Sequence, residues 1–90
     1  MFNSVQVQNW AVGNAGPNLS VIAGTTVVWN WAGNHNVWSM SSNNCASTVS
    51  LLGANSGVAV TLNNPGVYWY SCQVGTHCTN GNMIISVTVS

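Results

Sequence analysis

The side chains of this sequence that can bind a soft metal ion are few, and they lie beside predicted strands. His35 and His77 are the only histidines, Cys72 ends a predicted strand and Met83 begins the last one. Two imidazoles, a thiolate and a thioether form a mixed set of soft ligands, which suits copper with a weak axial thioether. Zinc also accepts two imidazoles and a thiolate. The residue types therefore predict a mononuclear metal site, with copper as the preferred ion.

The composition excludes several classes of function. The chain has no Lys, Arg, Asp or Glu, whereas an average protein is about 25% charged. It therefore has no carboxylate pair for glycoside hydrolysis and no cationic clamp for phosphates. It also has no basic face for nucleic acid or an anionic membrane. Because natural surfaces rarely lose both signs of charge, we interpret the chain as a redesigned, uncharged variant, and we expect that it is not an enzyme.

The order of residues along the chain predicts an all-β fold. Val, Thr, Trp, Tyr and Ile fill short runs that Gly, Asn and Pro separate. Between residues 41 and 57 we expect loops with one short helical turn at 47–52. Seven or eight short strands predict a two-sheet Greek-key β-sandwich, with residues 1–90 as a single domain. The runs that we predict as strands are 5–8, 19–21, 25–31, 36–40, 58–62, 67–72 and 83–89.

Membrane and secretion signals are weak in this sequence. No run approaches the roughly 18–20 consecutive apolar residues of a membrane helix, so we expect no membrane span. The first residues lack the basic region and apolar core of a secretory leader. Three cysteines predict one disulfide and one thiol with a separate role. A disulfide indicates an oxidising compartment.

The segment 68–78, YWYSCQVGTHC, resembles the copper loop of the phytocyanins, a branch of the cupredoxin family. The four-residue gap between Cys72 and His77, and the cysteine directly after that histidine, mark this branch. The segment His35-Asn36-Val37 resembles the first-ligand segment of the family. The resemblance covers residues 19–89, and it is strongest from His35 onward.

The resemblance implies a blue copper site in which His35, Cys72 and His77 are the principal ligands. In typical members the axial ligand follows the second histidine by five residues, where this chain has Asn82. Met83 shares one strand face with the apolar residues that follow at every second position. We therefore expect an extra residue in the loop 79–82 and Met83 as the axial ligand. Asn82, or no axial ligand, is the alternative.

The resemblance also implies how the remaining residues support the site. Cys45 and Cys78 would form the family's disulfide and leave Cys72 as a free thiolate. Asn36 would brace the ligand geometry from beside the first histidine. We expect Gly75 and Gly81 to allow a tight loop and close approach to the metal. Asn82 is expected to lie beside the site.

The function implied is that of an electron carrier that cycles between Cu(II) and Cu(I). Its partners would be redox proteins or small-molecule electron donors and acceptors, and His77 would be the electron port. For the family, a secreted, extracellular or periplasmic location and a monomeric state are expected. A metal-free phytocyanin-like domain would lack one or more ligands, whereas all four candidates are present here.

The main alternative is a disulfide-stapled carbohydrate-binding β-sandwich, in which exposed Trp and Tyr rings stack on sugars. We expect Trp29 and Trp31 to lie in the core or at its margin. Trp10 and Trp38 are the rings expected to be exposed. This alternative assigns no role to Cys72 or to the two histidines, so the position of the aromatic rings distinguishes the two hypotheses.

Overall fold

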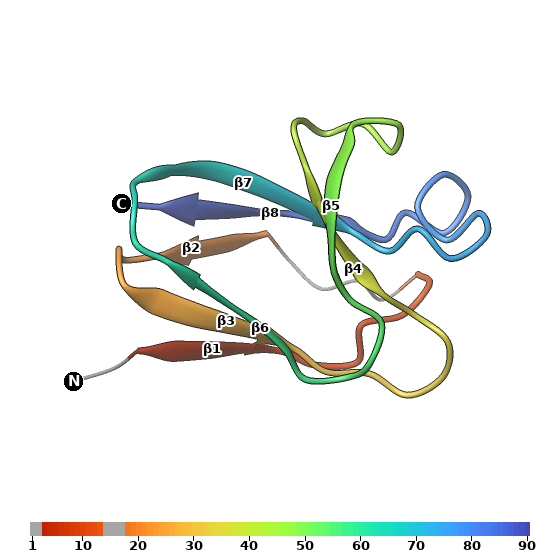
Figure 1. The fold of residues 1–90 in the computed structure, drawn as a ribbon, viewed down its shortest axis with the longest axis horizontal. Coiled ribbons are helices and arrows are strands. Elements are labelled where there is room, and N and C mark those ends of the chain that lie inside the picture. The colour runs from red at the N-terminus through yellow and green to blue at the C-terminus, as the bar shows by residue number, and fades with distance from the viewer. Residues whose placement is uncertain (1–2, 14–17) are drawn as a thin grey trace.

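The computed structural model describes residues 3–13 and 18–90, which form two facing β-sheets (Figure 1). The three-stranded sheet has the order β1 (Ser4–Val7), β3 (Thr25–Trp29) and β6 (Val58–Leu62). The five-stranded sheet has the order β2 (Leu19–Val21), β8 (Ile84–Val89), β7 (Gly66–Ser71), β4 (Val37–Met40) and β5 (Thr48–Gly53). The predicted all-β, two-sheet sandwich is confirmed. No helix of the described residues is long and apolar enough to cross a membrane.

Strand pairing is mixed. The strands β1 and β3 are parallel, as are β2 and β8, and the other neighbours are antiparallel. Alternate side chains of β3 explain why the sheets face each other: Thr25, Val27 and Trp29 are buried, whereas Thr26 and Val28 are partly exposed. The strand ends at Trp29 rather than at the predicted residue 31.

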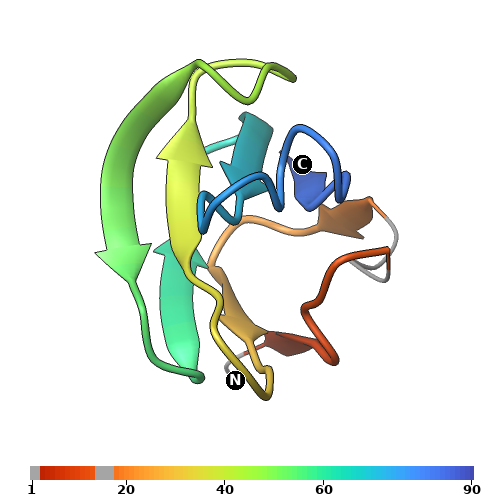
Figure 2. The ribbon, with the colours of Figure 1, turned by 90° about the vertical axis from the view of Figure 1, so that its right-hand side faces the viewer.

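Three loops meet at one end of the sandwich. Figure 2 looks onto this end and shows the loop 8–13, the loop 30–36 and the loop 72–83 lying next to one another. Hydrogen bonds join them: Trp10 Nε1 donates to the Asn36 carbonyl at 2.9 Å, and the Gly13 amide donates to the Gly81 carbonyl at 3.1 Å. Residues far apart in sequence, including those before and after β7, are thereby brought to the same place.

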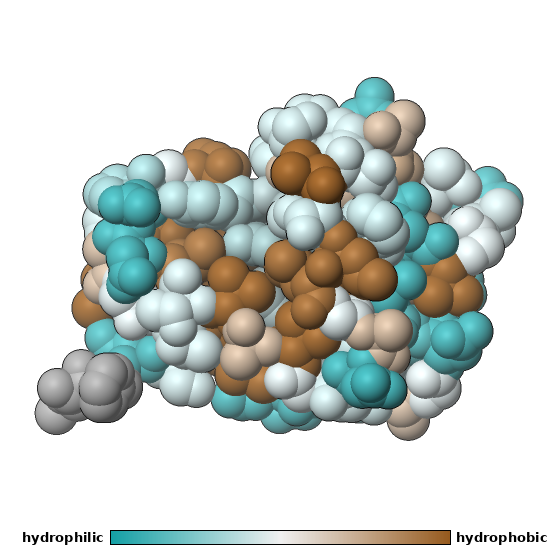
Figure 3. All heavy atoms as spheres, in the orientation of Figure 1, coloured by the Kyte–Doolittle hydropathy of each residue, from teal (hydrophilic) through white to brown (hydrophobic). Residues whose placement is uncertain are grey.

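The strand β5 corrects one prediction. Residues 48–53 form an edge strand paired with β4, so the helical turn predicted at 47–52 is wrong. The register between the two strands shifts twice, and Val49 and Leu52 have no opposite residue. Such bulges break the two-residue alternation by which a strand is recognised in sequence. Figure 3 shows apolar side chains interrupting the weakly polar surface over the middle of the molecule, where β5 crosses in Figure 1.

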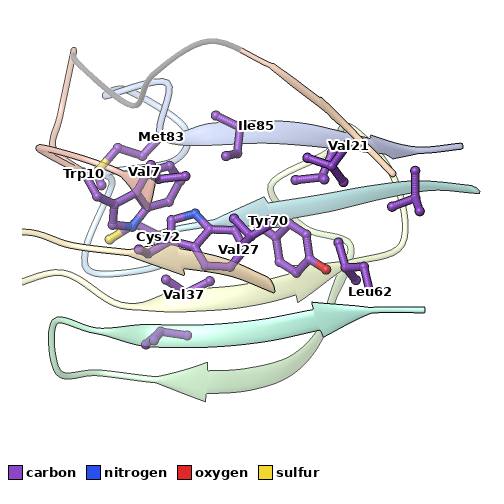
Figure 4. Close-up of a cluster of buried hydrophobic side chains, with 14 residues drawn as sticks. Val7, Trp10, Val21, Val27, Val37, Leu62, Tyr70, Cys72, Met83 and Ile85 are labelled. Carbon is purple, nitrogen blue, oxygen red and sulfur yellow. The ribbon is translucent and has the colours of Figure 1, made fainter. Parts of the chain in front are cut away.

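A single cluster of buried side chains lies between the sheets (Figure 4). Trp29 and Tyr70 pack with ring centroids 4.7 Å apart, and burial, with a smaller contribution from Tyr68, raises the pKa of Tyr70 to about 12. Trp10 belongs to this cluster and is 0% exposed, so its predicted exposure is wrong. Its buried indole donates a hydrogen bond to the Asn36 carbonyl. Trp38 is half-buried rather than exposed.

Candidate metal centre

The donor atoms of His35, Cys72 and His77 form a small triangle. The two Nδ1 atoms are 3.2 Å apart, and the Cys72 Sγ atom lies 3.8 Å from Nδ1 of His35 and 3.5 Å from Nδ1 of His77. Cys72 is fully buried and the histidines are partly buried. Among the described residues, no other group of three His, Cys, Asp or Glu side chains comes together in this way.

The size of this triangle fits a first-row transition-metal ion. The point equidistant from its three corners lies about 2.0 Å from each atom, which matches a metal–imidazole bond of about 2.0–2.1 Å and approaches a metal–thiolate bond of about 2.3 Å. Both histidines present the same ring nitrogen to the centre. Two imidazoles and a thiolate in one plane are the donor set of blue copper sites.

The loop 72–83 positions two of the three ligands through its own backbone. Cys72 follows β7 directly, and its amide donates to the Met83 carbonyl at 3.0 Å. The His77 amide donates to Val74, and the Met83 amide donates to the His77 carbonyl. These bonds fold the loop back on itself, so that His77 returns to Cys72 although four residues separate them.

The third ligand comes from the loop 30–36, and Asn36 connects that loop to Cys72. The side-chain oxygen of Asn36 accepts a hydrogen bond of 2.8 Å from the backbone amide of Gln73, the residue after Cys72. Because Asn36 follows His35 directly, this bond fixes the first histidine relative to the thiolate. The bracing role of Asn36 stays a prediction, and this contact supports it.

The side chain of Gln73, the residue after Cys72, forms a second connection between segments near the site. Its side-chain amide donates to the Cys45 carbonyl at 3.0 Å and to the Ser71 hydroxyl at 2.8 Å. The Ser71 hydroxyl donates in turn to the Met40 sulfur at 3.1 Å. One side chain thus joins β4, β7 and the loop after β4. Sequence reasoning missed Gln73, although its place beside Cys72 was a signal.

A disulfide joins Cys45 to Cys78, the pairing that the resemblance implied. It links the loop between β4 and β5 to the residue after His77, across 33 positions of sequence. Cys72 is the one free cysteine, and it is buried. The chain therefore keeps a thiol for the metal while its other two cysteines fasten the surroundings of His77.

Met83 and Asn82 differ in burial. Met83 is 0% exposed, and Figure 4 draws it at the same end of the buried cluster as Cys72 and Trp10. Asn82 is exposed, has a positive φ of 59° and takes part in the loop through its backbone. Asn82 thus lies in a left-handed turn directly before the buried Met83. The axial role of Met83 stays a prediction.

The two glycines of the loop serve different purposes. Gly75 has a φ of +50°, a conformation that costs a side chain energy, yet a Cβ there would have open space around it. At Gly81 a Cβ would lie 2.5 Å from the His77 carbonyl oxygen. Gly81 therefore allows a close approach to backbone and Gly75 meets a conformational need, whereas the close approach to the metal stays a prediction.

The chain has no Lys, Arg, Asp or Glu, so no ionic side chain of these types acts on the site. Burial lowers the pKa of His35 below its usual value, and repulsion from His77 lowers it further. A lowered pKa keeps the imidazole neutral, which is the form that binds a metal.

Solved structures of cupredoxins share this fold. Cucumber stellacyanin with Cu²⁺ has a TM-score of 0.70 at 24% identity, covering 99% of this chain and 96% of that one. A purple cupredoxin from Nitrosopumilus maritimus has a TM-score of 0.66 at 26% identity, covering 98% and 99%. A reduced amicyanin variant has a TM-score of 0.66 at 21% identity, covering 97% and 82%.

Comparison of sequences alone gives no such relatives: neither the family models nor the curated proteins match this chain. The assignment therefore rests on the fold and on the side chains at its loop end. The chain has the fold of the cupredoxins, and its loops bring His35, Cys72 and His77 into one triangle with the donor types of a type 1 copper site.

Proposed function

We propose that the protein is a single-domain carrier of single electrons, with one copper ion held by His35, Cys72 and His77. The observation that carries this proposal is the triangle of two Nδ1 atoms and one Sγ atom, whose sides of 3.2 to 3.8 Å suit a bound ion. Copper bound there would supply one-electron transfer by alternating between Cu(II) and Cu(I).

Each ligand has a distinct role. Cys72 provides the thiolate, whose burial keeps water from the metal–sulfur bond. His35 and His77 complete the plane as neutral imidazoles. Met83 is the proposed weak axial ligand, and its complete burial beside Cys72 supports this role over Asn82, which is exposed. His77 is the proposed electron port, because it lies in an outer loop and is only partly buried.

The surrounding residues resist movement of the ligands. The Asn36–Gln73 hydrogen bond and the Cys45–Cys78 disulfide both act within one residue of a ligand. A site held in this way changes little in geometry between oxidation states, which favours rapid electron transfer. No carboxylate is available as a general acid or base, and this supports a carrier rather than an enzyme.

The carbohydrate-binding alternative is not favoured. All five tryptophans and both tyrosines lie within the described residues, and none of them is exposed. A sugar-stacking platform needs flat rings open to solvent. Five of the seven rings belong to the core cluster or pack against it, and Trp38 and Trp69 are partly buried. The His–Cys–His triangle would have no role in sugar binding.

The absence of ionic side chains determines how we expect the protein to meet redox partners. Electrostatic steering requires charge on both partners, and this chain has no ionic side chain to provide it. We therefore expect the rate of electron exchange with a protein or small-molecule partner to change less than about twofold between low and physiological salt. A stopped-flow series in increasing salt checks this, and a steep dependence on ionic strength would contradict it.

The remaining features of the proposal concern cellular context. The disulfide supports an oxidising compartment, so we propose a secreted, extracellular or periplasmic setting. We propose a monomeric working state. The complete lack of ionic residues supports a redesigned, uncharged variant of a charged parent.

The decisive experiment is a titration of the metal-free protein with Cu(II), followed by visible absorption. We expect an intense thiolate-to-copper charge-transfer band that saturates at one equivalent. Cys72→Ser should lose the band while retaining its β-sheet circular dichroism, and Met83→Leu should shift the band where Asn82→Ala does not. Absence of a band in the wild type, with the Cys72 thiol confirmed as reduced, would overturn the proposed function.

A further inference from the structure

Trp10 lies outside the predicted site but contacts it directly. Its side chain is 0% exposed, and its indole Nε1–H donates to the Asn36 carbonyl at 2.9 Å. Asn36 is next to His35, and its side-chain oxygen accepts from the Gln73 amide at 2.8 Å. Two hydrogen bonds through one residue therefore connect the indole to the segments that carry His35 and Cys72.

The segment that carries Trp10 reaches the other ligand loop as well. The Gly13 amide donates to the Gly81 carbonyl at 3.1 Å. The methyl groups of Val12 lie so near Gly81 that a Cβ there would be 2.9 Å from one of them. The Trp10 amide itself donates to the Asn30 carbonyl at 3.0 Å, just beyond β3. Residues 10–13 are thus fixed to the sandwich and to both loops that bear ligands.

Trp29 provides a comparison within the same core. It is also 0% exposed, but its indole nitrogen has no hydrogen-bond partner among the described residues. Replacing either tryptophan with phenylalanine leaves a similar void in a packed interior. Only at position 10 does the replacement also remove a donor from a carbonyl beside a ligand.

We propose that Trp10 is a positioning residue, which fixes His35 relative to Cys72 through Asn36. The metal would be held by a geometry that the N-terminal segment helps to set, although that segment contributes no ligand. This inference rests on the proposed copper function for its consequence at the metal. Its structural part, the fastening of Asn36 by Trp10, holds for the metal-free protein.

Amide hydrogen exchange of the metal-free protein tests the structural part. In Trp10→Phe we expect the Gln73 and Gly13 amides to exchange about tenfold faster relative to the Ile85 amide of β8, because loss of a buried hydrogen bond makes local opening easier. In Trp29→Phe this ratio should stay unchanged. Equal ratios in the two variants would overturn the proposal.

The copper-loaded protein tests the consequence. We expect Trp10→Phe to shift the charge-transfer band and the reduction potential, and Trp29→Phe to leave both unchanged. If the wild type gives no band, the copper function fails while the exchange experiment still decides the role of Trp10. If the band forms but both variants match the wild type, the positioning role fails and the copper function stands.

A second variant separates the hydrogen bond from the size of the ring and serves if Trp10→Phe does not fold. Chemical synthesis can place a benzothiophene analogue of tryptophan at position 10, which replaces the indole N–H by sulfur and keeps the bicyclic shape. The same increase in Gln73 amide exchange is expected. Unchanged exchange in this protein would show that packing alone, and not donation to Asn36, holds the loop.

Discussion

Long-range contacts hold the two ligand loops, residues 30–36 and 72–83, whereas the edge strand β5 is held by a single neighbour. The ligand loops are joined by contacts between residues far apart in sequence, including the disulfide and the hydrogen bonds of Asn36 and Gln73. The strand β5 has one hydrogen-bonded neighbour, β4, and five of its six residues are exposed. Cross-links between distant segments therefore tie the ligand loops, whereas β5 is held at one side only.

The edge strand also shows what the absence of charge removes. Natural edge strands are commonly protected from pairing with other chains by charged side chains. Among the residues that the structure describes, half of the large, exposed apolar side chains lie on β5, namely Val49, Leu51 and Leu52. Its protection is limited to the two bulges, which twist an edge away from a regular partner. The ligand loops are therefore cross-linked by several long-range contacts, whereas the exposed edge of β5 has no charged side chain to protect it.

The largest expected effect is removal of the disulfide at the ligand loops. In the double variant Cys45→Ala, Cys78→Ala we expect the free energy of unfolding to fall by about 3–4 kcal/mol, because the cross-link closes a loop across 33 positions and so restricts the unfolded chain. Denaturant unfolding of the metal-free protein measures this loss. Added reductant should then have no further effect on the variant. Unfolding curves that coincide with those of the oxidised wild type would contradict the expectation.

An intermediate effect is expected at Gln73. Gln73→Leu preserves much of the side-chain volume but removes the donors to Cys45 and Ser71, and we expect a loss of about 1–2 kcal/mol in the free energy of unfolding. Gln8→Leu is the control, since Gln8 is exposed. Thermal and denaturant unfolding compare the two variants. If Gln73→Leu is no less stable than Gln8→Leu, the hydrogen bonds of Gln73 to Cys45 and Ser71 do not stabilise the ligand loops.

The smallest effect on stability is expected on the edge strand. Val49→Lys places a charge on β5 at a residue that is 65% exposed, and the free energy of unfolding should change by less than about 0.5 kcal/mol. Self-association at high protein concentration, followed by sedimentation, should nevertheless fall. Val67→Lys is the matched control, because Val67 is 58% exposed but lies on β7, which has a neighbour on both sides. Equal suppression by both variants would point to net charge rather than to the edge.

The sequence was informative where the pattern was local. The predicted runs matched seven of the eight strands of the described structure, and most of these runs were recognised by their alternation, which follows directly from the geometry of a strand. The prediction failed at β5, where two bulges disturb the alternation and pairing with β4 determines the structure. The prediction failed again at Trp10, whose burial and hydrogen bond to Asn36 involve residues 26 positions apart in the sequence.

The amino-acid sequence by itself determined the β class, the chemistry of the donors and the short spacing from Cys72 to His77, since all of these depend on residue types and near neighbours. The tertiary structure alone decided which distant groups meet. His35 approaches Cys72 across 37 positions, and Gln73 approaches the Cys45 carbonyl across 28. Such contacts become favourable only after two sheets have packed and the loss of chain entropy has been offset by burial, so no local pattern specifies them.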